Sequence, residues 1–353
     1  MSKMTRRVFL ATGTAAMAIA AREFSRPSFA QQPPGNAGVL NLYSARHYDT
    51  DTAVYQSFTN RTGIRINLVE AEADQLIERL RNEGANSPAD VLITVDAGRL
   101  WRAQQQGLFR PVSSPVLTRA VPASLRDPDN HWFGISRRAR VIMYNKDRVN
   151  PAQLSTYEDL VNPRWRGKIL TRSSSHVYNQ SLTGSLLAVH GETETEAWAR
   201  GLVANFARPP EGNDTAQIKA VAAGLGDLAI ANTYYLPRLA KSSNPEDQAV
   251  AAKIGVFFPN QRDRGTHVNI SGAGVLKNAP NPEAAIRFLE HLVSRESQEI
   301  FARSNNEYPV VAGVAIDPVL ASYGTFRADT MNAATFGRNN EPALRLMDRA
   351  GWK

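Results

Sequence analysis

Short apolar runs and amphipathic segments alternate along the first third of the chain. The run VLNLYSA at residues 39–45 is typical of a strand, and the apolar spacing in TAVYQSFTNRTG favours a helix that ends at Gly63. The same alternation predicts further strands at 64–71 and 89–95, an amphipathic helix that starts at Asp74 and is stopped at Gly84, and another helix at 97–109. Strands and helices at this spacing predict an α/β domain with a parallel sheet.

A long extended segment at residues 131–147, HWFGISRRARVIMYNKD, interrupts this rhythm because no helical pattern precedes it. The alternation then resumes and leads to one amphipathic helix after Pro282. The apolar positions of this helix form a stripe that we expect to be buried: Ile286, Leu289, Val293, Ile300 and Phe301. The interruption predicts a boundary between two parts of the chain.

The N-terminus has the pattern of an export signal. The basic residues in MSKMTRR precede a weakly apolar run at 8–21, and the small residues around Ala30 predict cleavage after it. TRRVFL matches the twin-arginine pattern, and an ordinary secretory signal with two arginines is the alternative. The run is too short to span a bilayer. We therefore predict a signal peptide at 1–30, a flexible leading segment at 31–38 and a mature protein outside the cytoplasm.

The composition is that of a globular protein long enough for two domains, because 42% of the 353 residues are apolar and 21% are charged. The absence of cysteine excludes disulfides, thiolate metal sites and cysteine nucleophiles. The net charge is +8, but residues 1–30 carry five basic residues and one acidic residue, so the remaining 36 basic and 32 acidic residues leave +4. The lack of a long basic run argues against a nucleic-acid partner.

Two adjacent tyrosines, Tyr234 and Tyr235, stand where the apolar run LAIA gives way to a helix-start signal. Neighbouring side chains on a helix point about 100° apart and cannot share one core pocket, so this pair is unusual for packing alone. The histidines lack the spacing of metal ligands, and we expect His176 to lie on a different face from Tyr178. Six other tyrosines fall within apolar patterns and are interpreted as core or surface residues: Tyr43, Tyr55, Tyr144, Tyr157, Tyr308 and Tyr323.

Four stretches are similar to the framework of periplasmic substrate-binding proteins of ABC importers: ADVLITVDAGRLWRAQQQGLFRPV, WFGISRRARVIMYNKD, LVNPRWRGKIL and NPEAAIRFLEHLVSRESQEIFA. With the Tyr-Tyr turn, residues 39–350 resemble the ferric-iron-binding branch, and especially its cyanobacterial-type members. The resemblance implies an α/β fold of two lobes, a type II clamshell, in which mixed, mostly parallel sheets flanked by helices are joined by crossover strands. It places 39–135 and 270–353 in lobe 1, 140–265 in lobe 2 and the hinge near 134–144 and 260–272.

The resemblance also implies an iron site between the lobes. Its ligands are His47 and Tyr48 from lobe 1 and Tyr178, Tyr234 and Tyr235 from lobe 2. Each locus follows a predicted strand and precedes or opens a predicted helix, and ligands gather at such turns beyond the carboxyl ends of strands. Whether His47 bonds the metal or only lies close to it stays open at this point.

The chemistry of these residue types suits a hard cation. A phenol has a pKa near ~10 and is neutral at pH 7, but a bound cation of high charge deprotonates it. Phenolate is a hard oxygen donor, and four phenolates with a neutral histidine leave a net charge of about −1 around Fe³⁺ and about −2 around Fe²⁺. The sequence does not decide between Fe³⁺ and Fe²⁺ as the transported ion. We expect arginine to offset this charge, and Arg138 and Arg238 are the candidates.

The predicted function is capture of iron by a periplasmic protein, a monomer, that delivers the ion to the inner-membrane permease of an ABC transporter. The alternative on the same fold is a binding protein for an oxyanion or a polyamine, because the serines in TRSSSH at 171–176 could cradle an anion. An enzyme is not expected, because the sequence contains no nucleophile elbow, phosphate-binding glycine loop or HExxH motif.

Overall fold

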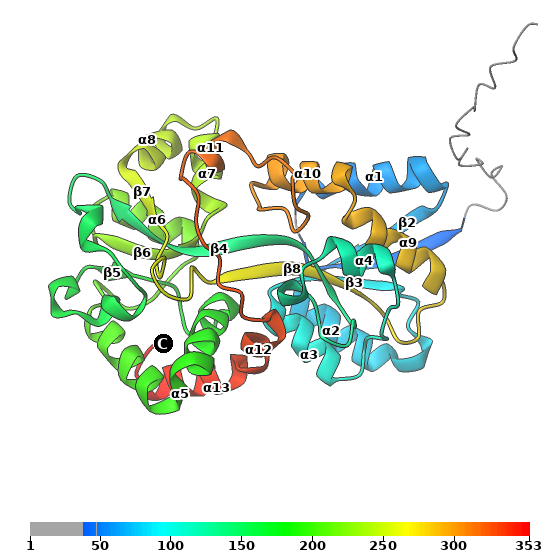
Figure 1. Cartoon of the computed structure of the whole chain (residues 1–353), viewed down its shortest axis with the longest axis horizontal. Helices are drawn as coiled ribbons and strands as arrows, with labels where there is room; N and C mark the ends of the chain where they lie inside the picture. The colour runs from blue at the N-terminus through cyan, green and yellow to red at the C-terminus, as the bar shows by residue number, and fades with distance from the viewer. Residues whose placement is uncertain (1–37, 47) are drawn as a thin grey trace, which may run out of the picture. The chain divides into compact units, whose positions relative to one another are not determined.

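Strands and helices alternate along most of the chain (Figure 1). The computed structural model describes residues 38–46 and 48–353, so the predicted signal peptide, the leading segment up to residue 37 and His47 lie outside the described residues. The strands are β1 (Val39–Ser44), β2 (Arg65–Glu70), β3 (Val91–Val95), β4 (Phe133–Asn145), β5 (Ile169–Leu170), β6 (Leu228–Asn232), β7 (Ile254–Phe257) and β8 (Val268–Val275). The α-helices are α1 (Asp51–Thr62), α2 (Ala73–Glu83), α3 (Ala97–Gln105), α4 (Pro115–Ala120), α5 (Val177–Ala204), α6 (Asp214–Ala222), α7 (Tyr235–Ala240), α8 (Pro245–Lys253), α9 (Pro282–Leu292), α10 (Arg295–Asn305), α11 (Pro318–Ala321), α12 (Ala333–Arg338) and α13 (Asn340–Arg349).

The strands form one mixed sheet in the order β2-β1-β3-β8-β4-β6-β5, and β7 pairs with β4. Strands β2, β1 and β3 are parallel, and so are β5 and β6. The predicted mixed sheet is confirmed, but parallel pairs are not the majority, since four of the seven pairings among the described strands are antiparallel. The reason is that β8 and β4 lie between the two parallel groups and run against their neighbours.

Strand β4 is the extended segment that interrupts the sequence pattern, and it runs across the middle of the described chain (Figure 1). Residues 133–139 pair with β8, whereas residues 140–145 pair with β6 and β7. Nearly all of its residues are buried, because it has neighbours on both edges and helices over both faces. One strand therefore connects the two parallel groups, as a crossover strand would; the lobe boundaries and the hinge remain predictions.

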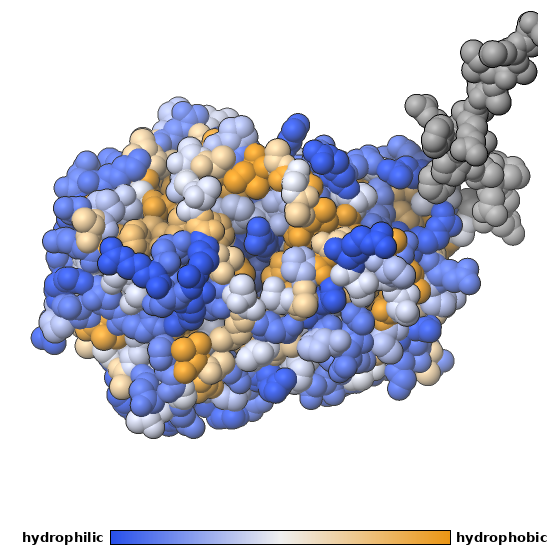
Figure 2. Space-filling view, viewed as in Figure 1, coloured by the Kyte–Doolittle hydropathy of each residue, from blue (hydrophilic) through white to orange (hydrophobic). Residues whose placement is uncertain are grey.

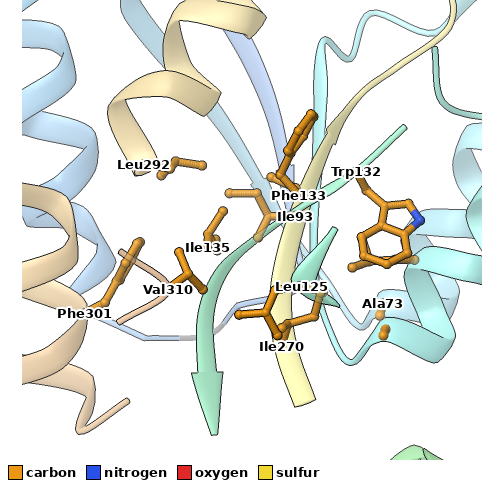
Figure 3. Packing of buried hydrophobic residues seen from close by; sticks show 14 of the residues in the cluster. Ala73, Ile93, Leu125, Trp132, Phe133, Ile135, Ile270, Leu292, Phe301 and Val310 are labelled. Carbon is orange, nitrogen blue, oxygen red and sulfur yellow. The ribbon is translucent and has the colours of Figure 1, made fainter. Parts of the chain in front are cut away.

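Helices α9 and α10 replace the single long helix that the apolar stripe predicts. Helix α9 ends at Leu292, and the Ser294 hydroxyl caps α10 by accepting a hydrogen bond from the Ser297 N–H at 3.3 Å. The large core beside these helices contains side chains from β3, β4 and β8 (Figure 3). Leu289, Val293 and Phe301 are buried in this core, whereas Ile286 and Ile300, which the stripe also predicts to be buried, are only partly buried.

The C-terminal residues belong to a second apolar cluster. Leu346 and Met347 of α13 pack along α5, and the ring of Trp352 lies 6.2 Å from that of Trp198. The resemblance assigns residues 340–353 to lobe 1, but the structure packs them with residues of predicted lobe 2. The physical reason is the buried side of α13, which meets α5 (Figure 1).

The surface is mostly polar on the face shown in Figure 2, where hydrophobic residues form scattered areas. Large exposed hydrophobic side chains are few among the described residues: Leu68, Val116, Val189 and Leu225. None of the helices in residues 38–46 and 48–353 combines the length and the apolar character that a membrane span needs.

Candidate metal centre

A cleft of about 200 Å³ lies where three strand-to-helix turns meet. Its walls are formed by Ala45, Arg46, Tyr48, Glu72, Ala73, Val95, Arg99, His176, Tyr178, Tyr234, Tyr235 and Arg238. The four tyrosines that the sequence suggests as ligands all line this one cleft. The fifth suggested ligand, His47, lies outside the described residues.

Local structure places each tyrosine at the turn between a strand and a helix. Tyr48 lies between β1 and α1, and Tyr178 lies in the first turn of α5. Tyr234 is the N-cap residue of α7, and Tyr235 is the first residue of that helix. The predicted strand-to-helix position of each locus is therefore confirmed, and it brings side chains from distant parts of the sequence together.

The phenols of three tyrosines are in direct contact. The hydroxyl oxygens of Tyr178 and Tyr234 are 3.0 Å apart and share a hydrogen bond, although 56 residues separate them in sequence. The rings of Tyr234 and Tyr235 lie 4.4 Å apart between centroids at an interplanar angle of 33°. Both rings of the Tyr234–Tyr235 pair therefore line the same cleft, and this shared position accounts for two adjacent tyrosines at the start of one helix.

Burial raises the pKa of three of the cleft phenols, those of Tyr48, Tyr234 and Tyr235. Burial raises the pKa of Tyr48 to about 12, and the carboxylate of Glu307 adds to the effect. Burial, followed by the neighbouring phenols, also raises the pKa of Tyr234 and of Tyr235 above the ordinary value. These three phenols would therefore need a strong cationic partner to become phenolates at neutral pH.

Arginines face the phenol rings from several sides. The Arg238 guanidinium lies 4.7 Å from the ring centroid of Tyr48 and 4.8 Å from that of Tyr234. The Arg138 guanidinium is buried and lies 5.5 Å from the ring centroid of Tyr178. Within the described residues, Nε and Nη2 of Arg138 have no hydrogen-bond partner. Both arginines that the sequence suggests are thus beside the tyrosines, where they can offset negative charge.

Arg46 is a member of this cluster that sequence reasoning missed. It is buried, its Nε donates to Asp51 Oδ2 at 2.7 Å, and its Nη2 donates to Glu307 Oε2 at 3.0 Å. Its guanidinium lies 4.7 Å from the ring centroid of Tyr48. Arg46 stands at the end of an apolar strand, two positions before Tyr48, and this position was the available signal. An arginine there points to a buried charge with a partner, because arginine is rarely buried unpaired.

His176 also lines the cleft, contrary to the expectation that it lies on another face from Tyr178. Its ring contacts the Tyr178 ring at 4.3 Å between centroids, and its Nδ1 accepts the Tyr178 backbone N–H at 3.3 Å. The expectation failed because His176 is the N-cap of α5 with an extended backbone, so helical spacing does not apply to it. Burial, then the charge of Arg172, lowers the pKa of His176 to about 2, so the ring is neutral.

The serines that could cradle an anion are engaged elsewhere. The hydroxyls of Ser173 and Ser175 lie 2.9 Å apart and bond to each other, and the Ser174 hydroxyl donates to Asp348 at 3.2 Å. These three residues are not among those that line the cleft. The anion alternative therefore lacks the donors on which it was based.

Known proteins resemble this chain along almost its whole length. Residues 86–329 match the model of the bacterial extracellular solute-binding protein family. Iron uptake protein A2 of Synechocystis sp. is 56% identical and aligns with 100% of this chain and 99% of its own. The Fe(3+)-binding periplasmic protein of Serratia marcescens is 31% identical over 91% of this chain and 93% of its own.

A solved structure gives the same result for the fold. The Trichodesmium protein IdiA (FutA), in complex with iron and citrate ligands, is 64% identical, covers 90% of this chain and 100% of its own, and superposes with a TM-score of 0.88. The predicted α/β fold class of two-lobed periplasmic binding proteins is thereby confirmed. By sequence and by fold, this chain belongs to the family of bacterial extracellular solute-binding proteins.

Proposed function

We propose that this protein captures ferric iron outside the cytoplasm and delivers it to the permease of an ABC importer. The observation that carries the proposal is the convergence of Tyr48, Tyr178, Tyr234 and Tyr235 on one cleft. The names of the similar proteins point the same way, since they describe iron uptake, Fe(3+) binding and a complex with iron and citrate.

In this proposal the four phenols bind the ion as phenolates. Buried neutral phenols are poor ligands for soft or weakly charged metals, whereas a hard trivalent cation favours oxygen donors and displaces their protons. His47 precedes Tyr48 in the sequence and stays a suggested fifth ligand. The guanidinium groups of Arg138 and Arg238 then compensate the negative charge of the loaded site.

The charges around the cleft favour Fe³⁺ over the alternative cargoes. Fe²⁺ would leave one more unit of uncompensated negative charge on the phenolates, or would leave one phenol protonated. A polyamine would meet the same guanidinium groups as Fe³⁺, but its ammonium groups would not displace the phenol protons and so would gain no phenolate ligands. An oxyanion would gain little from phenol rings that are already in contact with one another.

We further propose that the protein is a transport component and not an enzyme, that it acts in the periplasm as a monomer, and that it reaches this compartment by the predicted signal at residues 1–30. The two parts joined by β4 would close over the bound ion, and the permease would recognise the closed form. Twin-arginine export, which moves folded proteins, would allow the site to be complete before the protein crosses the membrane.

The test is a double variant, Tyr234→Phe with Tyr235→Phe. It removes two hydroxyls and keeps both rings, so the fold should persist while tight ferric binding is lost. Iron-phenolate absorption in the visible range reports loading, and metal analysis checks stoichiometry. Tyr144→Phe is the matched control, because Tyr144 lies in β4 and does not line the cleft. Native-like loading of the double variant would exclude the proposed site.

A further inference from the structure

Asp96 connects β3 to α3 in a backbone conformation that residues with a side chain rarely adopt. Its φ is 85°, in the left-handed region. The residue is fully buried, and its backbone N–H donates to the carbonyl oxygen of Ile270 in β8 at 2.8 Å. Strain of this kind is kept only where the surrounding contacts hold it, and it is concentrated at functional positions.

The carboxylate of Asp96 is held by donors from three directions. Its Oδ1 accepts the Gly98 N–H at 2.9 Å and the Ser181 hydroxyl at 2.6 Å. Its Oδ2 accepts from Asn269 Nδ2 at 2.8 Å and lies 3.9 Å from Arg138 Nη2. Gly98 lies in the same predicted lobe as Asp96 and Asn269 lies in the predicted hinge, whereas Ser181 belongs to α5 in the other lobe. Among the donors to Asp96, Ser181 is therefore the one that comes from predicted lobe 2.

Ser181 lies one helical turn after Tyr178 on α5, so both side chains are on one side of that helix. Asn340 of α13 donates to the Ser181 hydroxyl oxygen at 3.1 Å. Helix α3 begins close to the Asn340 side chain: a Cβ built on Gly98 would lie only 1.9 Å from Asn340 Oδ1. The hydrogen bonds thus run from Asn340 through Ser181 to Asp96, and Val95 and Tyr178, close to them in sequence, line the cleft.

We propose that the Ser181–Asp96 hydrogen bond is a latch that holds the two lobes together over the bound ion; this inference rests on the proposed function. Both groups are fully buried, so separation of α5 from α3 must break the bond and return both groups to water. Arg138 connects the latch to the cleft, because its Nη2 lies 3.9 Å from Asp96 Oδ2 and its guanidinium lies 5.5 Å from the ring centroid of Tyr178. Ser181 and Asp96 are therefore positioning residues that determine how long iron is retained.

The size of the effect expected from loss of the Ser181 hydrogen bond follows from the charge of its acceptor, the Asp96 carboxylate. A hydrogen bond to a buried ionised group is stronger than one between neutral groups, and its loss shifts an equilibrium by about tenfold to a hundredfold. Ser181→Ala removes this donor and leaves the other donors to Asp96 in place. The rate of iron release, which requires opening, should rise by about the same factor.

Ferric release from the full-length mature protein into excess EDTA tests this inference, with decay of the iron-phenolate absorption as the readout. Ser185→Ala is the matched control, because Ser185 is also buried on α5 but donates within its own helix, to the Leu182 carbonyl at 2.7 Å. We expect faster release from Ser181→Ala and an unchanged rate from Ser185→Ala. Equal rates for Ser181→Ala and the wild type would overturn the latch.

A distance measurement separates failure of the latch from failure of the proposed function. The chain has no cysteine, so spin labels can be placed at Gln75→Cys in α2 and Glu246→Cys in α8, both exposed and in different predicted lobes. In metal-free protein, Ser181→Ala should move the distribution of label distances toward longer values, and an unchanged distribution would overturn the latch. If the wild type binds no ferric iron, the proposed function fails, and this measurement still decides the inference.

Discussion

Iron binding should release several protons, and its affinity should therefore rise steeply with pH. Burial is the main cause that raises the pKa of Tyr48 to about 12; Glu307 and the Tyr178 phenol add to it, and Arg46 and Arg238 oppose it. The Tyr48 phenol is thus protonated in the free protein between about pH 6 and pH 8. A proton must leave whenever it becomes an iron ligand.

The same reasoning covers the Tyr-Tyr turn. Burial and neighbouring phenols raise the pKa of Tyr234, against the charge of Arg138. Burial raises the pKa of Tyr235 as well, with further contributions from Tyr178 and Asp214. Each proton released changes the apparent affinity about tenfold per pH unit, so these two phenols with Tyr48 predict about a thousandfold per unit. Deprotonating Tyr48 alone at pH 7 costs about 7 kcal/mol, from five pH units at about 1.4 kcal/mol each.

Competition with a ferric chelator whose own protonation is known, repeated at several pH values, measures this slope. A pH-indicator dye in weakly buffered solution counts the protons directly at each addition of ferric ion. Tyr235→Phe should lower the count by one, and Tyr144→Phe, outside the cleft, should leave it unchanged. A wild-type count of one proton or fewer would refute the reasoning, because at most one buried phenol could then be a ligand.

Two further predictions concern stability. Arg46→Met leaves the buried carboxylates of Asp51 and Glu307 without their partner, and urea unfolding should show a loss of about 3–5 kcal/mol; an unchanged midpoint would mean that these carboxylates find other partners. Although burial opposes it, hydrogen bonds from Asn260 and Arg264 and the charge of Arg264 lower the pKa of Glu158 to about 2. Because this folded-state pKa is depressed, the stabilisation is present above the unfolded pKa of about 4.3 and is lost as pH falls through about 2. Acid denaturation of Glu158→Gln should therefore converge with that of the wild type across this window, whereas a constant difference down to the lowest pH would contradict the assignment.

Much of the fold and the place of the tyrosines could be predicted because both depend on local patterns. The turns that carry Tyr48, Tyr178 and Tyr234 follow short strands and open helices, which apolar periodicity and capping residues reveal. The extended pattern at residues 131–147 likewise became strand β4. That the tyrosines share one cleft came from the family resemblance, since spacing along the chain carries no information about distance between separate turns.

What the sequence did not reveal depends on contacts between distant residues. Arg46 is buried because Glu307, 261 positions later, supplies a charge beside it. His176 was misplaced because helical spacing was applied to a residue that caps the helix. The packing of α13 on α5 was missed for a similar reason, because either core could cover an amphipathic C-terminal helix with a stripe at Ala343, Leu346 and Met347.

The electrostatics of the cleft explain how one site can be both protonated when empty and charged when loaded. Buried phenols alone would resist deprotonation, and buried guanidinium groups alone would be costly cations. Arg238 lies against two phenol rings, and Arg138 has nitrogens without a hydrogen-bond partner among the described residues. Each phenolate formed would place negative charge beside a cation that is already in position, so part of the cost of ionisation is offset before any metal arrives. If the proposed site is right, a trivalent ion would supply the remainder and a less highly charged ion would supply less, so the cleft would select its cargo by charge.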